Sequence, residues 1–241
     1  MTPSLQLSTP PTYPARPING GPLPKAPLKS GNWFYEPKYN GWRALVHVPT
    51  GTMFNRKGEK LSIAGEFSAA LRKLRTFLPD GHPIEWLDCE ALERRHQMGR
   101  GSLFVLDFIP PKDEAMFHDP DASPMFFGLH PESDYDRRRQ ILTSIFGDSF
   151  TWADDKCLAR VPATDQIYLT PSIKACNALP LWNELTQANA ILREWQKAKG
   201  VAKPQDFYEG VVAKRADARY PVQLRRPDEE THTWMKHRWA W

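Results

Sequence analysis

The chain has 241 residues, and its 32 Lys and Arg residues against 28 Asp and Glu residues give a formal net charge of +4. Its composition is that of a globular domain, and no apolar run approaches the roughly 20 residues that cross a bilayer, which excludes a helical membrane protein. Three separated cysteines (Cys89, Cys157 and Cys176) form neither a disulfide framework nor a CxxC zinc motif. We therefore expect a reducing, cytoplasmic setting. The small positive charge permits a polyanionic partner without demanding one.

The first thirty residues differ from the rest of the chain. They hold eight of the 23 prolines, no acidic residue, and three basic residues, Arg16, Lys25 and Lys29. Proline at this density blocks helices and ladder hydrogen bonds. Residues 1–30 are therefore expected to form an extended or irregular, loosely ordered arm that lies on a domain formed by residues 31–241.

From residue 33 onward the pattern is mixed α/β. Short apolar runs bounded by proline, glycine and charged residues predict strands at residues 44–48, 83–92, 102–109, 208–215 and 233–239. Apolar residues at helical spacing predict helices at 67–78, 134–146 and 181–199, the second capped near Ser133 or Asp134. The polar stretch 216–233 is expected to be a loop. Strands without regular βαβ alternation favour an α+β domain with antiparallel sheets flanked by helices.

A lysine stands just ahead of the first of these strands, in the segment EPKYNGWR at residues 36–43. Gly41 would let the backbone turn and let a bulky ligand approach. Lys38 could act as a nucleophile if neighbouring cations or burial lower its pKa enough to give a neutral amine. A solvated lysine in a turn is the commoner explanation for such a segment taken alone.

Two acidic residues, Asp88 and Glu90, share one face of the strand LDCEAL because strand side chains alternate. Carboxylates beside an apolar run need compensation by a metal ion or by cations. Hard oxygen ligands of this kind suit Mg²⁺ or Mn²⁺. The alternative is a structural pair neutralised by Arg94, Arg95 or a helix lysine.

Two later strands carry further charges. In YEGVVAKR, alternation places Glu209 on the face of Val211, and Lys214 lies at the end of the strand. In TWMKHRW, Lys236 and Arg238 share a face, which predicts an anion such as phosphate between them. A nucleophilic lysine, metal-capable carboxylates and phosphate-capable cations on one domain are what nucleotidyl transfer requires.

The ordered series KYNGWR, FNRKGEKL, LDCEAL, FVLDFI, EGVVAKR and WMKHR resembles the covalent nucleotidyltransferases, and most closely the ATP-dependent DNA ligases. The resemblance covers residues 33–239. Each motif alone is weak, whereas six in this order make a chance match improbable. The resemblance implies a nucleotidyltransferase (ATP-grasp-like) fold with adenylyltransferase activity for residues 31–241.

The resemblance also implies roles for individual residues. Lys38 would be the catalytic residue, forming a lysyl-AMP phosphoramidate. For the aromatic that stacks on adenine we choose Phe104, on a strand face expected to carry Leu106 and Phe108 as well. The other nucleotide-binding residues would be Glu36 and Pro37 near the adenine edge, Arg43 and Arg56 at ribose and phosphate, Glu90 at the ribose, Lys236 at the α-phosphate, and Lys214 and Arg238 beside it. The metal-binding residues would be Asp88, Glu90 and Glu209.

Three features depart from the pattern of these ligases. Asn40 replaces the usual Asp of KxDG, which removes a carboxylate near the nucleophile. Cys89 replaces the usual Gly of LDGE, and its side chain is expected to point away from the acids. The chain stops three residues after Arg238, where most relatives continue into an OB-fold. We therefore expect that domain to be absent.

The implied reaction has three nucleotidyl-transfer steps. AMP passes from ATP to Lys38 and then from Lys38 to the 5′-phosphate at a nick. The adjacent 3′-OH then attacks this phosphate, which seals the backbone and releases AMP. We expect ATP as the AMP donor, Mg²⁺ or Mn²⁺, a nicked duplex DNA substrate that could contain RNA, and a monomer. A separate OB-fold or clamp protein could help to hold DNA. The three arginines at 137–139 are expected to form either a phosphate-binding surface or a solvated helix face. Further basic residues that could join a phosphate-binding surface are Arg94, Arg95, Arg100, Arg219, Arg225 and Arg226.

Other functions fit the same motifs. Some RNA ligases of the superfamily also vary the Asp of KxDG. A capping-type guanylyltransferase would use GTP in place of ATP. A degenerate protein could bind a nick or a nucleotide without covalent transfer, because Asn40 and the absent OB-fold both depart from the active pattern.

Overall fold

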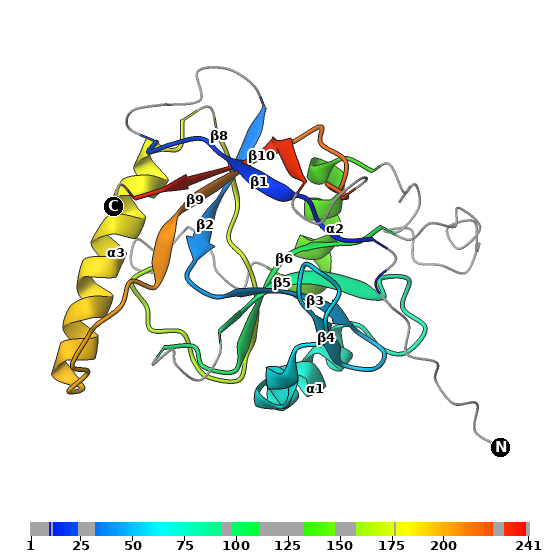
Figure 1. Cartoon of the computed structure of the whole chain (residues 1–241), viewed down its shortest axis with the longest axis horizontal. Coiled ribbons are helices and arrows are strands. Elements are labelled where there is room, and N and C mark those ends of the chain that lie inside the picture. Colours follow the sequence, from blue (N-terminus) through cyan, green and yellow to red (C-terminus); the bar gives the residue numbers. More distant parts are fainter. Residues whose placement is uncertain are drawn as a thin grey trace.

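The computed structural model describes residues 10, 12–23, 32–92, 98–110, 133–147, 158–175, 177–223 and 229–239. Within these residues two five-stranded, mostly antiparallel sheets are accompanied by three α-helices (Figure 1). The predicted α+β class with antiparallel sheets is confirmed. No helix in the described part of the chain is long and apolar enough to cross a membrane.

The first sheet has the strand order β1-β10-β9-β2-β8. Its strands are β1 (Arg16–Asn19), β10 (Glu230–Arg238), β9 (Tyr208–Arg215), β2 (Trp33–Tyr39) and β8 (Ile173–Ala175). Only β1 and β10 run parallel. Strand β2 accommodates Pro37 because β8 pairs with residues 33–35 alone, so that edge of β2 has no ladder partner at the proline within the described chain.

The second sheet has the strand order β4-β3-β5-β6-β7. Its strands are β4 (Thr52–Phe54), β3 (Trp42–His47), β5 (Trp86–Leu92), β6 (Ser102–Phe108) and β7 (Ile167–Leu169). The chain passes from the first sheet to the second at Asn40 and Gly41, between β2 and β3. The glycine is required there, because a Cβ atom would lie 2.8 Å from the backbone oxygen of Ala91. Close packing on β5 is therefore a reason for Gly41 that the sequence did not reveal.

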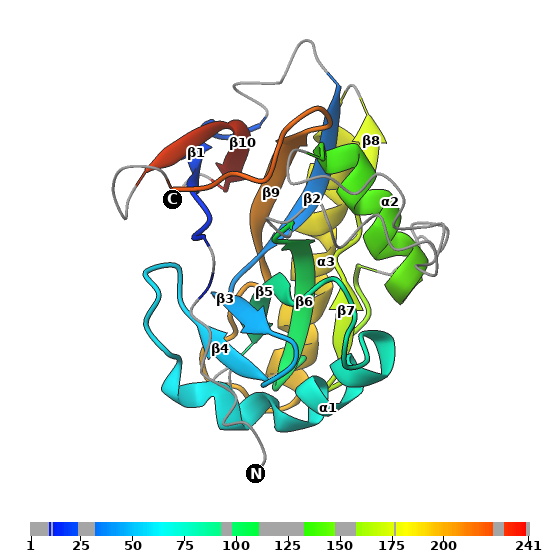
Figure 2. The same ribbon diagram turned by 90° about the vertical axis from the view of Figure 1, so that its right-hand side faces the viewer.

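The helices cover the apolar faces of the sheets. They are the 3₁₀ helix η1 (Ser62–Phe67) and the α-helices α1 (Ser68–Phe77), α2 (Tyr135–Phe146) and α3 (Leu179–Ala198). Helices α1 and α2 share one apolar core with the second sheet, and α3 packs along β2 and β9 of the first (Figures 1 and 2). The predicted cap of α2 is confirmed, since the Asp134 side chain accepts a hydrogen bond from the Arg137 amide at 2.8 Å.

Each sheet has one face covered by helices, and its other face is turned toward the other sheet. These two facing surfaces enclose polar side chains. Figure 2 shows the first sheet above the second, with the connection from β2 to β3 joining them. Glu36 and Lys214 of the first sheet are almost fully buried, as is Asp88 of the second. Buried charges need partners of opposite sign, so the space between the sheets is where the pairing of charges decides the structure.

Several strands differ from the sequence-based expectations. Lys38 lies inside β2 and not ahead of a strand, and β4, β7 and β8, of three residues each, were missed. The predicted loop 216–233 is wrong at its end, because β10 begins at Glu230. The first residues of β10 pair with β1 and not with β9, so they are partly exposed and their polar sequence resembles a loop.

Part of the proline-rich arm is built into the fold. Residues 16–19 form strand β1 of the first sheet, and Ala15 and Leu23 beside it are each 2% exposed. The backbone here is extended, as expected, but this part is packed tightly and not loosely. Residues 1–9, 11 and 24–30 of the arm lie outside the described chain.

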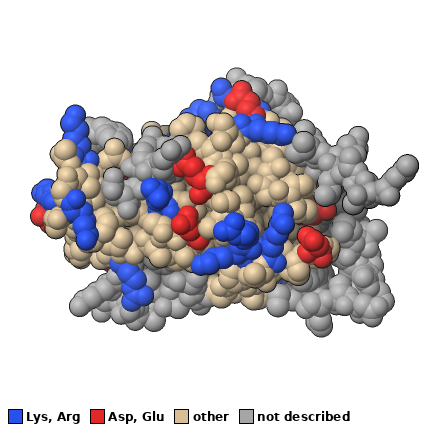
Figure 3. Space-filling model, turned by 90° about the horizontal axis from the view of Figure 1, so that it is seen from below, with Lys and Arg blue, Asp and Glu red and all other residues tan. Residues whose placement is uncertain are grey.

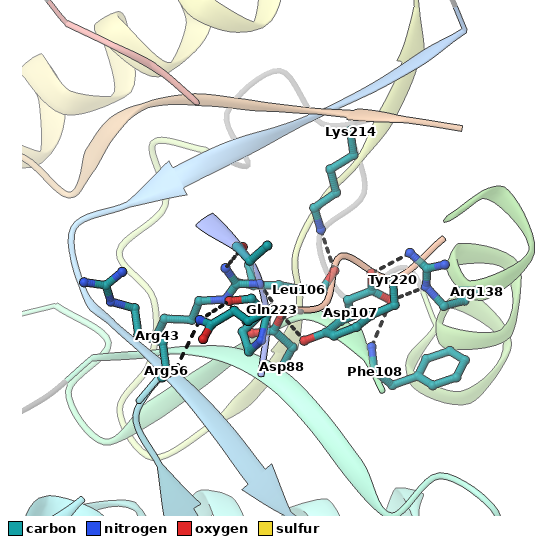
Figure 4. A network of polar contacts seen from close by, with 12 residues as sticks. Arg43, Arg56, Asp88, Leu106, Asp107, Phe108, Arg138, Lys214, Tyr220 and Gln223 are labelled. Atoms are coloured by element: carbon teal, nitrogen blue, oxygen red, sulfur yellow. Dashed lines mark hydrogen bonds and ion pairs between the residues drawn. The ribbon is translucent and has the colours of Figure 1, made fainter. Parts of the chain in front are cut away.

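The three arginines of α2 are not one surface. Arg138 is fully buried and donates through Nε and Nη2 to the two carboxylate oxygens of Asp107, at 2.9 and 3.0 Å (Figure 4). Arg139 is 8% exposed. Both the phosphate-binding surface and the solvated helix face expected at 137–139 are therefore wrong for Arg138 and Arg139. Arg94, Arg95, Arg225 and Arg226 lie outside the described residues.

We expect Arg138→Ala to lower the free energy of unfolding by about 3–5 kcal/mol, because it leaves the Asp107 carboxylate buried without its cation. Urea unfolding measures the change. The matched control is Arg137→Ala on the same helix, whose effect should stay within about 0.5 kcal/mol. Equal effects of the two substitutions would contradict a structural role for the buried pair.

Candidate functional site

A cavity of about 310 Å³ lies between the inner faces of the two sheets, and we call it the inter-sheet cavity. Its walls come from β1, β2, the start of β3, β5, β6, β9 and β10. Nine of the twelve site residues predicted from the sequence line it, and these are Glu36, Pro37, Lys38, Arg43, Arg56, Glu90, Lys214, Lys236 and Arg238. Segments as distant in sequence as those of Arg16 and Arg238 thus converge on one space.

Lys38 lies near the end of β2, and its Nζ atom is 2.5 Å from Oε2 of Glu209. A β-bulge produces this pair. Lys38 is opposite Gly210 and Tyr39 is opposite Tyr208, so Glu209 is an extra residue in β9. Val211 is buried against α3, and the bulge lets the carboxylate of Glu209 reach Lys38.

The bulge depends on the glycine that follows Glu209. Gly210 has a φ of +144°, a conformation that side chains with a Cβ atom rarely adopt. A Cβ atom there would also lie 1.9 Å from the carbonyl oxygen of His237 on β10. The glycine of the EGVVAKR segment thus lets two strands approach closely and aims the preceding carboxylate at the lysine.

A buried ion pair closes one end of the inter-sheet cavity. Lys214 Nζ lies 2.8 Å from Oε2 of Glu36 and donates to the backbone oxygen of Leu106 at 2.8 Å. The ammonium also lies 4.3 Å from the ring centroid of Trp234 and 4.6 Å from that of Tyr135. The Tyr135 hydroxyl donates to the other oxygen of Glu36. Both charges are therefore held rigidly by first-sheet and α2 side chains.

Arg43 is held by Asp88 on the neighbouring strand. Its Nε and Nη2 atoms lie 2.9 and 2.5 Å from the two oxygens of Asp88, and Tyr220 donates to the same carboxylate at 2.9 Å (Figure 4). Burial alone would lower the pKa of Arg43, but the Asp88 carboxylate outweighs it and the pKa is raised. Asp88 is fully buried and does not line the cavity, so the structure separates it from the carboxylates that could reach a metal ion.

Glu90 is the carboxylate of the second sheet that faces the cavity. Its Oε1 atom accepts a hydrogen bond from the Gly41 amide at 3.0 Å. Burial raises the pKa of Glu90 to about 7, and the charge of Glu209 adds to the rise, while Lys38 and Arg43 oppose it. Glu90 therefore changes its charge near neutral pH. Cys89 beside it points into the opposite apolar core, as the sequence indicated.

Cations gather along the wall formed by β1 and β10. Lys236 and Arg238 both line the cavity, which confirms that they share a strand face. Arg238 Nη2 lies 3.3 Å from Oε2 of Glu209. Burial lowers the pKa of Lys236, and the positive charges of Arg16 and Arg238 lower it further. An anion in the cavity would relieve this repulsion.

The choice of Phe104 as the aromatic that stacks on a base is wrong for this structure. The side chain is fully buried, with its ring centroid 4.3 Å from that of Tyr39 and 5.1 Å from that of Tyr168. A β-bulge leaves Leu106 without a partner on β5, which moves Phe108 to the opposite core. The three residues do not share a face, and Leu106 alone lines the cavity.

Several residues of the cavity wall were not predicted from the sequence. Two of them are Trp234 and Arg16. Trp234 shares its strand face with Lys236 and Arg238, a period-two relation that could have revealed it. It is 2% exposed, and its indole N–H has no hydrogen-bond partner among the described residues. Arg16 carried no signal, because it lies in the proline-rich arm. Its position depends on the pairing of β1 with β10.

Glu209 does not line the inter-sheet cavity but borders another cavity, of about 610 Å³, on the α3 side of β9. Trp182 and Trp239 form part of its wall, with ring centroids 4.3 Å apart. Asn40 contributes as well, and its side-chain amide donates to the Asp206 backbone oxygen at 3.2 Å. A carboxylate at position 40 could not donate this bond, which gives a structural reason for the departure from KxDG.

The described residues contain no cluster of three or more His, Cys, Asp or Glu side chains that could hold a metal ion. Glu90 and Glu209 face the same lysine, and their charges act on one another. Two carboxylates suit a Mg²⁺ or Mn²⁺ ion that takes its remaining ligands from water and nucleotide phosphates. They do not form a complete protein site for such an ion.

No protein-family model matches the chain, and no curated protein matches its sequence. Solved structures that resemble it include a mycobacterial DNA ligase D complexed with ATP and MES, at 21% identity and a TM-score of 0.47, over 94% of this chain and 60% of that one. The Chlorella virus DNA ligase–adenylate is 14% identical, with a TM-score of 0.46, over 93% of this chain and 68% of that one. The ligase domain from M. tuberculosis LigD is 19% identical, with a TM-score of 0.44, over 93% of this chain and 58% of that one. The likeness is one of fold.

We expect Asn40→Asp to lower the free energy of unfolding by about 1–2 kcal/mol at pH 8, because the new carboxylate faces the Asp206 carbonyl oxygen without a proton to donate. Chemical denaturation measures the change. Asn40→Ser, which keeps a donor, should recover part of the loss. A variant Asn40→Asp as stable as the wild type would show that this hydrogen bond contributes nothing.

Glu90→Gln should gain stability relative to the wild type as the pH rises from 5 to 8. A carboxyl group whose pKa is raised on folding stabilises the protein below its ordinary value of 4.5, and this contribution is lost as pH rises through about 7. The shift corresponds to at most about 3 kcal/mol. Urea unfolding of both proteins at pH 5 and pH 8 gives the difference, with Glu194→Gln on exposed α3 as the control for losing one carboxylate. A gap that is the same at both pH values would contradict the raised pKa.

Proposed function

We propose that the chain is an ATP-dependent DNA ligase that works through a lysyl-AMP intermediate. The observation that carries this proposal is the convergence on one cavity of Lys38, the carboxylates of Glu36 and Glu90, and a wall of cations, with the Glu209 carboxylate 2.5 Å from the lysine. The motif resemblance gives each of these groups a role in nucleotidyl transfer.

The first step would take place at Nζ of Lys38. The neutral amine attacks the α-phosphorus of ATP, a P–N bond forms, and the bond from the α-phosphorus to the bridging oxygen breaks, so that pyrophosphate leaves with both bonding electrons. The amine loses a proton in the process. Lys236 and Arg238 line the same cavity and can neutralise the phosphate oxygens.

The contact between Lys38 and Glu209 sets a requirement for this step. At 2.5 Å the carboxylate stabilises the protonated ammonium, which is not a nucleophile. Glu209 must therefore accept the proton or move to another cation before attack. Arg238 already lies within 3.3 Å of the same oxygen and offers the alternative partner. Glu90 and Glu209 would hold a divalent ion, which supplies charge neutralisation at the phosphates.

The second and third steps would pass AMP to the 5′-phosphate at a nick and join it to the adjacent 3′-OH. We propose nicked duplex DNA as the substrate. The face viewed in Figure 3 carries Lys and Arg side chains in separate groups with acidic side chains between them, not one continuous basic surface. Binding through few phosphate contacts should be weak and should fall only modestly as salt rises, because the salt dependence scales with the number of phosphates that are neutralised.

Lys38→Ala should abolish labelling of the protein by α-labelled ATP with Mg²⁺, because the acceptor of AMP is removed. Acid-labile adduct on a denaturing gel is the readout, with Lys199→Ala on the exposed end of α3 as the matched control that keeps full labelling. An adduct that survives Lys38→Ala, or no adduct on the wild-type protein, would overturn the proposal.

The same assay separates the alternatives. Labelling by GTP in place of ATP would indicate a guanylyltransferase, and nucleotide binding without an adduct would indicate a non-catalytic protein. Sealing of nicked RNA–DNA hybrids in preference to nicked DNA would indicate an RNA ligase. Sealing of nicked DNA by the labelled protein is the result that the proposal requires.

A further inference from the structure

The arm places an arginine on the wall of the inter-sheet cavity. Arg16 is the first residue of β1, and it lines the cavity together with Arg56, Lys236 and Arg238. It belongs to none of the six motifs, all of which begin at residue 38 or later. The nucleotide-binding resemblance therefore does not account for it.

The backbone holds Arg16 in place from both sides. Its amide donates to the Glu229 oxygen at 2.8 Å, and the Ala15 amide donates to the Pro221 oxygen at 2.8 Å. The Ala15 oxygen accepts a hydrogen bond from Nη1 of Arg43 at 3.4 Å. The arm thus contacts a residue of the cavity wall on the second sheet while it pairs with β10 of the first.

The far end of β1 is fixed as firmly. The Gly20 amide donates to the Lys236 oxygen at 3.0 Å, and the Gly21 oxygen lies 2.9 Å from Nδ1 of His237. A Cβ atom on Gly20 would lie 2.4 Å from the His237 ring, which shows how closely the arm packs on β10. Because both ends are fixed, β1 is part of the wall, and it holds Arg16 there although the β1–β10 register shifts between Pro17 and Ile18.

Arg16 belongs to a group of cations on this wall. The positive charges of Arg16 and Arg238 are among the causes that lower the pKa of Lys236, and Glu230, which lies opposite Arg16 in the ladder, opposes this effect. Arg238 shares the carboxylate of Glu209 with Lys38. Cations held together by strand pairing favour a polyanion between them.

We propose that Arg16 is a substrate-binding residue that contacts the polyphosphate of the nucleotide. The inference rests on the proposed function and adds to it a phosphate contact supplied by the arm. A planar guanidinium can bind two phosphate oxygens at once. A triphosphate carries more charge than a monophosphate and extends further along the wall, so Arg16 should matter for ATP and little for AMP.

The test measures binding of α,β-methylene-ATP and of AMP by calorimetry, since the methylene bridge prevents transfer to Lys38. Arg16→Ala should weaken binding of the triphosphate analogue by roughly tenfold or more and change AMP binding less than about twofold. Arg16→Lys should bind the triphosphate analogue more weakly than the wild type and more tightly than Arg16→Ala, because lysine keeps the charge and loses the bidentate guanidinium. Arg72→Ala, which removes an exposed arginine from α1, controls for net charge, and Asn19→Ala controls for changes in β1.

The outcomes separate the two proposals. A wild-type protein that binds neither probe overturns the proposed function and this inference together. A wild-type protein that binds both, with Arg16→Ala unchanged for the triphosphate analogue, overturns the inference alone. Equal weakening for both probes, with or without a lowered thermal midpoint, also overturns it, because a structural effect or an α-phosphate contact would not discriminate between them.

Discussion

The pairing of charges within each of two facing sheets, at the space that they enclose, is the constraint on which this structure depends. Lys214 with Glu36, Arg43 with Asp88, and Lys38 with Glu209 place opposite charges together where water is largely excluded. Each such pair must be well aligned, because an unpaired buried charge costs several kcal/mol. Two of the pairs are held by further donors, Tyr135 and Tyr220, so their geometry is over-determined. What remains adjustable is the pair of Lys38 and Glu209, which has no such tyrosine donor among the contacts described above.

Two β-bulges arrange the third pair and its surroundings. The bulge at Glu209 brings its carboxylate within reach of Lys38, and the bulge at Leu106 brings Asp107 opposite Asp88. Asp107 then binds Arg138 of α2, which anchors that helix to the second sheet. Each bulge reverses the side-chain alternation that a regular strand would have. A site of mixed charge can therefore lie beside strands whose remaining residues are apolar.

Most of the elements could be predicted from local pattern. The helices at 134–146 and 181–199 and the strands around Cys89 and Val211 have strong apolar periodicity, and the structure contains all of them. The prediction of strands was poor where a strand forms only by pairing with a segment far away in the sequence. Strand β1 has a proline-rich sequence and forms because β10 offers a free edge for pairing. The first residues of β10 pair with β1 and stay partly exposed, so polar side chains are tolerated at 230–233 and the segment has no apolar strand pattern. Three-residue strands such as β7 and β8 are too short to show a period.

The sequence by itself determined the chemical inventory: the lysine, the carboxylates and the cations, their order in the chain, and the strands β5, β9 and β10 that carry several of them. Only the tertiary structure decided which of them face one another. It placed Phe104 in the core, gave Asp88 to Arg43, turned Glu209 to Lys38 and brought Arg16 of the arm to the cavity wall. The physical reason is that side-chain direction follows from strand register, and a single bulge or a pairing with distant chain changes that register without leaving a local mark in the sequence.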